Sequence, residues 1–243
     1  MKTMSVSRAE AASATANPHR ALVWDAAVRV FHWLMVLCFA GAWLTADSER
    51  WRLLHVTLGY TMAGLVGFRI VWGWLGTRHA RFGNFVRSPA AVRRYLASLL
   101  RGSPEHHVGH NPAGALAIVA LLALTVAAAA TGWAAHNELG GEWLAELHEA
   151  AANVMLAAVG IHLAGVVISS WLHRENLVGA MLHGRKPVPE QHGIARSRWS
   201  VALLLIALVG SFWWTQWTDS AAVQAASQRT VAHAQALHDR DDD

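Results

Sequence analysis

The chain has 243 residues, of which 54% are hydrophobic and only 15% are charged. A soluble domain usually carries about 25% charged residues, so this composition argues against a soluble globular protein. The net charge is +4 at pH 7, but the basic residues lie between long apolar segments, which favours membrane lipid over nucleic acid as a partner. We therefore expect no nucleic-acid binding.

The chain begins with a polar segment and continues with five apolar ones. Residues 1–22 are rich in Ala and Ser and lack the apolar core of a signal peptide, so we predict a mobile tail. A helix needs about 20 mostly apolar residues to cross a bilayer. The segments that meet this requirement are Ala27–Ala46, Leu53–Leu75, Pro112–Ala135, His148–Leu172 and Trp199–Trp217. They predict an all-α integral membrane helix bundle.

The loops between these helices differ in charge. Arg and Lys concentrate in the N-terminal segment and in the loops between the second and third and between the fourth and fifth helices. The link between the first two helices has only Arg50 and Arg52, and the loop between the third and fourth has Glu138, Glu142 and Glu146 and no basic residue. Because cytoplasmic loops carry the excess of Arg and Lys, we predict a cytoplasmic N-terminus and an outer C-terminus.

Four of the 15 histidines lie in or at the start of the predicted membrane helices, namely His32, His55, His148 and His162. Ionisable residues inside a membrane are costly and are functional by default. Neutral imidazole is also a common axial ligand of haem iron. His148 and His162 are 14 residues apart on one helix, which places them about 21 Å apart along the axis and about 40° apart around it. One face of this helix thus presents one candidate ligand near the outer surface and one nearer the cytoplasm.

The depths of the four histidines allow one matched pairing. His32 is early in the first helix and pairs with His162 near the cytoplasm, whereas His55 opens the second helix and pairs with His148 near the outer surface. We predict two stacked bis-histidine haems of the b type, because the one cysteine, Cys38, excludes covalent attachment through a C-x-x-C-H motif. The alternative is that the histidines are polar contacts between helices.

Two further features of the membrane helices fit haem. Arg69 lies 14 residues after His55, at the depth of the inner haem, where its guanidinium either neutralises a propionate or extends to the cytoplasmic interface. Glycines on the second and fourth helices either admit a flat macrocycle or serve ordinary helix packing. These are Gly59, Gly64, Gly67, Gly160 and Gly165.

Four stretches of the chain match a known family in the right order. They are VWDAAVRVFHW around His32, LLHVTLGYTMAGLVGFRIVWG from Leu53, GHNPAGALAIVALLALTVAAAATGW from Gly109 and LHEAAANVMLAAVGIHLAGVVISSWLHRENLVGAMLHGRK from Leu147. Together they cover about Val23–Lys186. The sequence resembles the bacterial di-haem cytochrome b561 family, which is grouped with the b-type cytochrome subunits of nickel–iron hydrogenases.

The resemblance implies a division of the chain and a function. Residues 23–186 would form a four-helix di-haem core in a bacterial inner membrane, with ligands at positions matching His32, His55, His148 and His162. The family's members look like electron carriers between the quinone pool and an external partner, such as a c-type cytochrome or a hydrogenase. Residues 187–218, a basic loop and a fifth membrane helix, and residues 219–243, a periplasmic tail, depart from the family. We expect this addition to be dispensable for haem binding and to serve docking, unless the tail merely solubilises the chain.

Other functions remain open at this stage. The chain alone could oxidise a small external reductant such as superoxide and reduce quinone, although the acidic loop opposes the steering of an anion. It could also be a haem-free membrane anchor. Whether the protein is an enzyme in its own right is undecided, and an electron-transfer subunit is the favoured interpretation.

Overall fold

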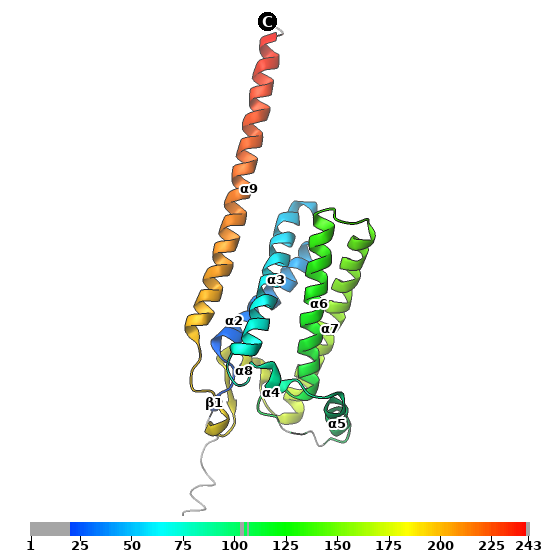
Figure 1. The fold of residues 1–243 in the computed structure, drawn as a ribbon, viewed down its shortest axis with the longest axis vertical. Helices are drawn as coiled ribbons and strands as arrows, with labels where there is room; N and C mark the ends of the chain where they lie inside the picture. Colours follow the sequence, from blue (N-terminus) through cyan, green and yellow to red (C-terminus); the bar gives the residue numbers. More distant parts are fainter. Residues whose placement is uncertain (1–19, 103–104, 106, 242–243) are drawn as a thin grey trace, which may run out of the picture.

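The structure, a computed structural model, describes residues 20–102, 105 and 107–241, and within them it is a bundle of long helices (Figure 1). The long helices are α2 (Ala26–Thr45), α3 (Arg52–Leu75), α6 (Pro112–His136), α7 (Trp143–His173) and α9 (Trp199–Asp241). Among the described residues, these five are long and apolar enough to cross a membrane, the span in α9 ending at Ser220. The all-α membrane bundle and its five spans are confirmed.

Local sequence explains where these helices begin. Asp25 caps α2 by accepting a hydrogen bond from the Val28 N–H, and Asn111 caps α6 in the same way for Gly114. Pro112 occupies the first turn of α6, where its missing N–H costs nothing. Helix α7 begins at Trp143, earlier than predicted, and Glu146 in its first turn suits the positive end of the helix dipole.

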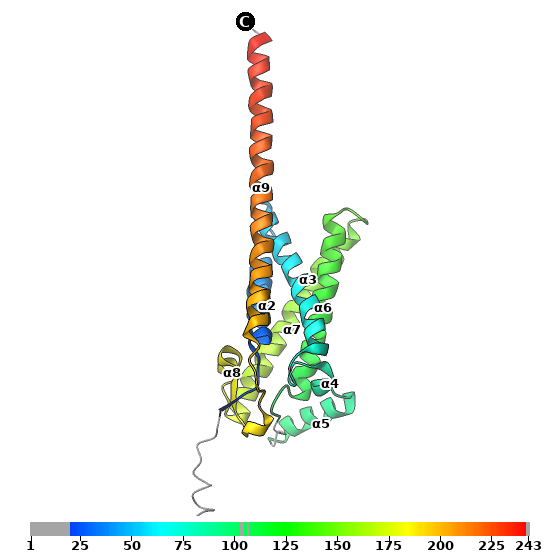
Figure 2. The same ribbon diagram turned by 60° about the vertical axis from the view of Figure 1, so that its left-hand side comes forward.

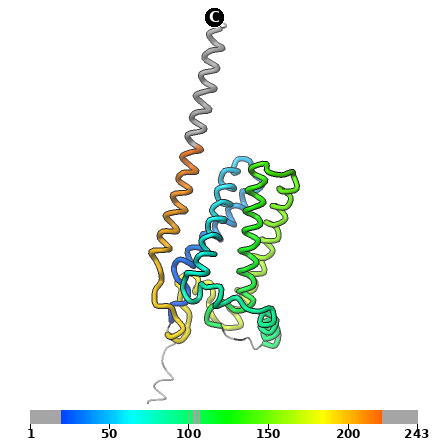
Figure 3. Tube along the Cα trace, in the orientation of Figure 1, coloured from blue at the N-terminus to red at the C-terminus, as the bar shows by residue number. Residues whose placement is uncertain are grey.

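The long helices form two antiparallel hairpins and an added helix (Figure 3). Helix α2 packs against α3, α6 against α7, and α3 against α6, while α9 packs mainly along α2. The shared apolar core consists of Cys38, Leu58, Met62, Leu65, Ala128, Met155 and Leu205. Cys38 is thus a buried packing residue.

Helix α9 contributes to this core, while the expectation that it is dispensable for haem binding stays a prediction. Leu205 and Ala202 are buried against the bundle, and the Trp213 Nε1–H donates to the Thr61 Oγ1 of α3 at 2.9 Å. The segment predicted as an outer tail from Asp219 continues the same helix to Asp241.

Short elements gather at one end of the bundle, called here the capped end (Figure 2). They are β1 (Arg20–Leu22), α4 (Phe82–Phe85), α5 (Pro89–Leu100), α8 (Leu177–His183), β2 (Arg185–Pro187) and η2 (Glu190–His192). Strands β1 and β2 pair antiparallel, so the last three residues of the predicted tail are ordered, while residues 1–19 lie outside the described chain. The other end, called the hairpin end, carries η1 (Glu49–Trp51) and the α6–α7 link.

Candidate functional site

At the hairpin end, the structure brings His55 of α3 and His148 of α7 together. Their ring centres are 6.1 Å apart and their planes are inclined by 85°. A first-row metal ion binds imidazole nitrogen at about 2.0–2.1 Å, so two rings on one ion have centres roughly 6 Å apart. The spacing of the two rings therefore suits two axial ligands of a single ion.

Both rings of this pair are oriented by backbone carbonyls. The Nδ1 of His55 lies 2.9 Å from the Ala42 carbonyl oxygen, and that of His148 lies 2.8 Å from the Ala128 carbonyl oxygen. A carbonyl only accepts, so each Nδ1 carries the hydrogen and each Nε2 keeps its lone pair for a metal. Metal-ligating histidines commonly show this arrangement.

The neighbouring helices are built to make these contacts. Ala42 lies in the last turn of α2, where carbonyls lack helical partners, and the Ala46 N–H there bonds to Trp43 instead. On α6, a Cβ at Gly132 would lie 2.8 Å from the Nδ1 and Cε1 of His148. Only glycine at this position lets the ring lie against α6. Sequence reasoning did not identify Gly132, because its role depends on a neighbouring helix.

Toward the capped end lie His32 of α2 and His162 of α7, both half-buried. The two residues are within electrostatic range of each other, although no direct contact joins their rings among the described residues. The Nδ1 of His32 is buried and has no hydrogen-bond partner. Helices α2 and α7 share few contacts, so these histidines are not brought together by direct packing of their helices.

The glycines that were expected either to pack helices or to admit a macrocycle can now be placed. A Cβ added at Gly59, Gly64, Gly67, Gly160 or Gly165 would meet nothing within 4 Å. None of the five is therefore a close helix contact, and α3 and α7, which carry them, share few contacts. The open space at these positions is compatible with a bound flat group, and in the described residues none of the five glycines serves a close helix contact.

Arg69 is buried in the protein and does not extend to the surface. Its side chain is 2% exposed, and its guanidinium lies 4.8 Å from the ring centre of Phe82 and 5.6 Å from that of Phe85. Helix α4 can bring these rings under α3 because Gly73 has no side chain where the Phe82 ring lies. The Nη1 of Arg69 has no hydrogen-bond partner.

His110 lies outside the predicted membrane helices, where a solvated loop side chain is the default, yet the structure buries it. Its ring packs 4.5 Å from Trp24 and 4.7 Å from Phe85, and its Nδ1 is buried without a partner. Burial and, next, the charge of Arg69 lower the pKa of His110 to about 3, so the ring is neutral. The sequence signal that could have indicated this burial is the place of His110 just before the Asn-Pro start of α6, level with the end of the bundle.

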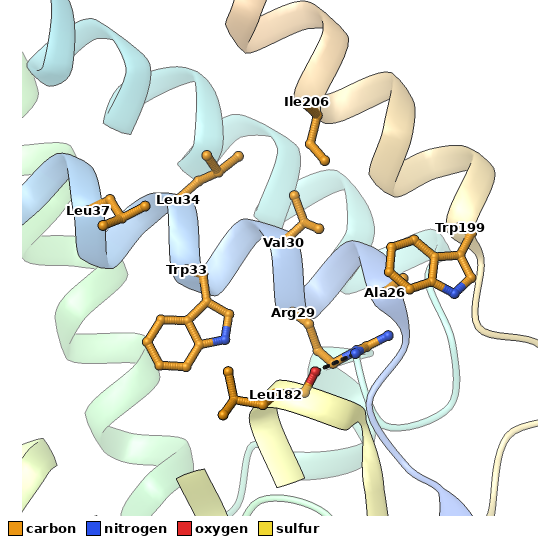
Figure 4. Close-up of a pocket in the computed structure, with 9 residues that line it drawn as sticks. All are labelled: Ala26, Arg29, Val30, Trp33, Leu34, Leu37, Leu182, Trp199 and Ile206. Atoms are coloured by element: carbon orange, nitrogen blue, oxygen red, sulfur yellow. Dashed lines mark hydrogen bonds between the residues drawn. The ribbon is translucent and has the colours of Figure 1, made fainter. Parts of the chain in front are cut away.

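A groove runs along one face of α2, between α8 and α9 (Figure 4). It has a volume of about 300 Å³ and is lined by Ala26, Arg29, Val30, Trp33, Leu34, Leu37, Leu182, Trp199 and Ile206. The Arg29 Nη1–H donates to the Leu182 carbonyl at 2.6 Å, and the guanidinium lies 5.3 Å from the Trp199 ring centre. The Trp33 ring is 5.1 Å from that of His32, so Trp33 connects the groove to a candidate ligand.

The fold and these sites define a multi-pass helical membrane protein with the His55–His148 pair at one end of its bundle and His32 and His162 toward the other. A model of the family described as prokaryotic cytochrome b561 matches residues 23–184. The chain belongs to this family of bacterial membrane b-type cytochromes, which implies haem b as its cofactor.

Curated relatives share part of this chain. It is 28% identical over 145 residues to the probable Ni/Fe-hydrogenase 1 B-type cytochrome subunit of Escherichia coli K12, covering 48% of this chain and 60% of the relative. It is 33% identical over 152 residues to the probable Ni/Fe-hydrogenase B-type cytochrome subunit of Azotobacter chroococcum mcd 1, covering 50% of this chain and 62% of the relative. The chain thus spans about 60% of the length of these relatives. No solved structure matches it significantly.

Proposed function

We propose that this protein carries electrons across its membrane through two b haems. His55 and His148 would hold the haem at the hairpin end, and His32 and His162 the one toward the capped end. The observation that carries the proposal is the His55–His148 pair, whose spacing is 6.1 Å and whose Nδ1 atoms are both fixed by carbonyls. A bound haem supplies an iron that takes up and releases one electron, with a potential set by its ligands and surroundings.

The chain's own residues act on the two sites in distinct ways. At the hairpin end, the Ala42 and Ala128 carbonyls hold the imidazoles in one tautomer and make Nε2 a better donor to iron. Toward the capped end, the buried Arg69 places a positive charge where a propionate would lie. The apolar helices and the surrounding lipid would exclude water from both sites, which would limit the rearrangement that accompanies a change of charge.

We further propose that the capped end faces the cytoplasm and the hairpin end the periplasm. The capped end carries the basic segments, including Arg185 and Lys186 in β2, and the hairpin end carries the acidic α6–α7 link. Positive loops remain in the cytoplasm. With five spans, the C-terminus would then be periplasmic.

A membrane quinone is the proposed partner on the lipid side, and the groove of Figure 4 is its proposed place. The groove is mostly apolar, which suits a quinone ring and its isoprenoid chain. Arg29 retains N–H donors for an oxygen of the quinone ring. Oxidation of a quinol releases two electrons, which two bound haems would take up one each, and two protons, which would pass to the aqueous phase. Trp33 lies between the groove and His32, so the distance to the nearer haem would be short.

The partner on the periplasmic side is proposed to be a hydrogenase or a c-type cytochrome. The hydrogenase proposal follows from the relatives, which are named as probable hydrogenase cytochrome subunits. Direct oxidation of superoxide is less favoured, because Glu138 and Glu142 on the α6–α7 link and Glu146 at the start of α7 repel anions at the hairpin end.

The decisive experiment is a reduced-minus-oxidised absorption spectrum of the purified protein together with its haem stoichiometry by pyridine haemochrome. The proposal expects two b haems per chain. A protein without haem would instead be a membrane anchor, and a protein with one haem would contradict the paired arrangement.

A further inference from the structure

Two buried nitrogen atoms at the capped end lack hydrogen-bond partners and lie against the same ring. The Nη1 of Arg69 and the Nδ1 of His110 are both buried and unpartnered. The guanidinium lies 5.6 Å from the ring centre of Phe85, and the imidazole ring lies 4.7 Å from it. Buried polar groups normally have partners, so two unpaired nitrogens around one ring indicate a ligand that the chain itself does not supply.

His110 is held at this place by its neighbours in the chain and in space. It precedes Asn111, whose side chain caps α6 by accepting from the Gly114 N–H, and its ring is packed between Trp24 and Phe85. The ring is neutral at physiological pH because burial and the charge of Arg69 lower its pKa to about 3. A neutral imidazole with its hydrogen on Nδ1 is a donor that needs an acceptor.

The charges nearby indicate that this acceptor is an anion. Asp25 is 1% exposed and already accepts hydrogen bonds from the Val28 N–H, the Trp72 Nε1–H and the Thr77 hydroxyl. Its single carboxylate lies within electrostatic range of two guanidiniums, those of Arg29 and Arg69. The local charge therefore remains positive, and an uncompensated buried charge is costly.

We propose that Arg69 and His110 together form a carboxylate-binding site that holds a propionate of the capped-end haem. The assignment rests on the proposed function and extends it, because it makes His110 a second cofactor-binding residue beside Arg69. His162, a candidate ligand of that haem, lies within electrostatic range of His110. The carboxylate would accept from both nitrogens and neutralise the remaining charge.

A competing explanation is that His110 only fills space between Trp24 and Phe85, and two variants separate these roles. His110→Phe keeps a flat ring but removes the donor, whereas His110→Asn places an amide N–H near the position of Nδ1. Without the donor, the negative charge of the propionate is less compensated, and this charge stabilises the oxidised iron. A neutral hydrogen bond is worth enough to change the reduction equilibrium roughly two- to tenfold, and tenfold equals about 59 mV for one electron.

The test is a redox titration of the purified holoprotein, in which the capped-end haem is identified as the one lost from His32→Ala. We expect His110→Phe to lower the reduction potential of that haem. In His110→Asn, the reduction equilibrium constant of the same haem should stay within about twofold of the wild-type value. His136→Phe, at the opposite end of α6, is the matched control and should leave that haem unchanged.

Each outcome decides the matter. Two haems with wild-type potentials in His110→Phe would overturn the propionate site and leave the proposed function intact. If His110→Phe loses the haem, His110→Asn decides: retention at the native potential supports the site, and loss in both variants means that the ring only packs. A wild-type protein without haem would contradict the proposed function itself.

Discussion

The imidazoles of His55 and His148 lie 6.1 Å apart, and each gives its Nδ1 hydrogen to a carbonyl of a neighbouring helix. The two residues come from different hairpins of the bundle, and α3 and α7 share few contacts. The pair is thus positioned by α2 and α6, which supply the carbonyls, and not by direct packing between the helices that carry the rings.

Replacing either residue of a pair should remove one haem. We expect His148→Ala or His55→Ala to lower the stoichiometry from two haems per chain toward one, measured by pyridine haemochrome, because one imidazole cannot hold the iron at that depth. His32→Ala and His162→Ala should remove the other haem. His136→Ala, on an exposed residue, is the control, and two haems retained in His148→Ala would contradict the ligand assignment.

Gly132→Ala should weaken the hairpin-end haem without touching a ligand. The added Cβ would lie 2.8 Å from the His148 ring, so the ring must move away from the Ala128 carbonyl. Loss of such an outer contact typically costs about 10–100-fold in metal affinity, which a haem titration of the apoprotein can measure. Gly210→Ala, where a Cβ meets nothing within 4 Å, should bind haem normally. Equal affinities for the two variants would show that the carbonyl contact is unimportant.

Arg69→Gln should lower the potential of the capped-end haem. Removing a buried positive charge favours the oxidised iron, and this side chain is 2% exposed, so solvent screens it little. Redox titration should show the potential of one haem shifted and that of the other nearly unchanged. The shift should be larger than the one in His110→Phe. Arg78→Gln, an exposed arginine at the same end, should shift neither haem. If Arg69→Gln behaves like Arg78→Gln, the charge does not act on haem.

Filling the groove should block exchange with quinone while leaving both haems in place. Ile206→Trp adds bulk to the groove lining, so we expect slower reduction of the haems by quinol and normal reduction by dithionite. Leu203→Trp, which is 60% exposed on the same helix and does not line the groove, is the control. Unchanged quinol kinetics in Ile206→Trp would place the quinone elsewhere.

Shortening α9 should separate its packing role from docking. A chain ending at Ser220 keeps Leu205 and the Trp213–Thr61 hydrogen bond, so it should retain both haems. If the acidic end docks a partner, this chain should lose salt-sensitive electron exchange with it. A chain ending at Gln191 removes part of the core and should be less stable, so it is not a clean test of docking. Unchanged exchange in the chain ending at Ser220 would dismiss the docking role.

The sequence by itself determined the five spans, the family and the set of candidate histidines. Crossing a bilayer requires about 20 apolar residues in a row, and this requirement is visible in any linear sequence. The shared face of His148 and His162 also follows locally, because helix geometry converts a spacing of 14 residues into depth and direction. These inferences need no knowledge of how one helix packs against another.

Only the tertiary structure decided which groups surround the histidines and how α9 is attached. The carbonyls of Ala42 and Ala128, the space at Gly132 and the buried nitrogen of His110 all depend on contacts between helices distant in sequence. Helix α9 reads as a separable apolar segment, yet Leu205 packs into the common core. Membrane helices are apolar on every side, so their sequences do not reveal which face meets lipid and which meets protein.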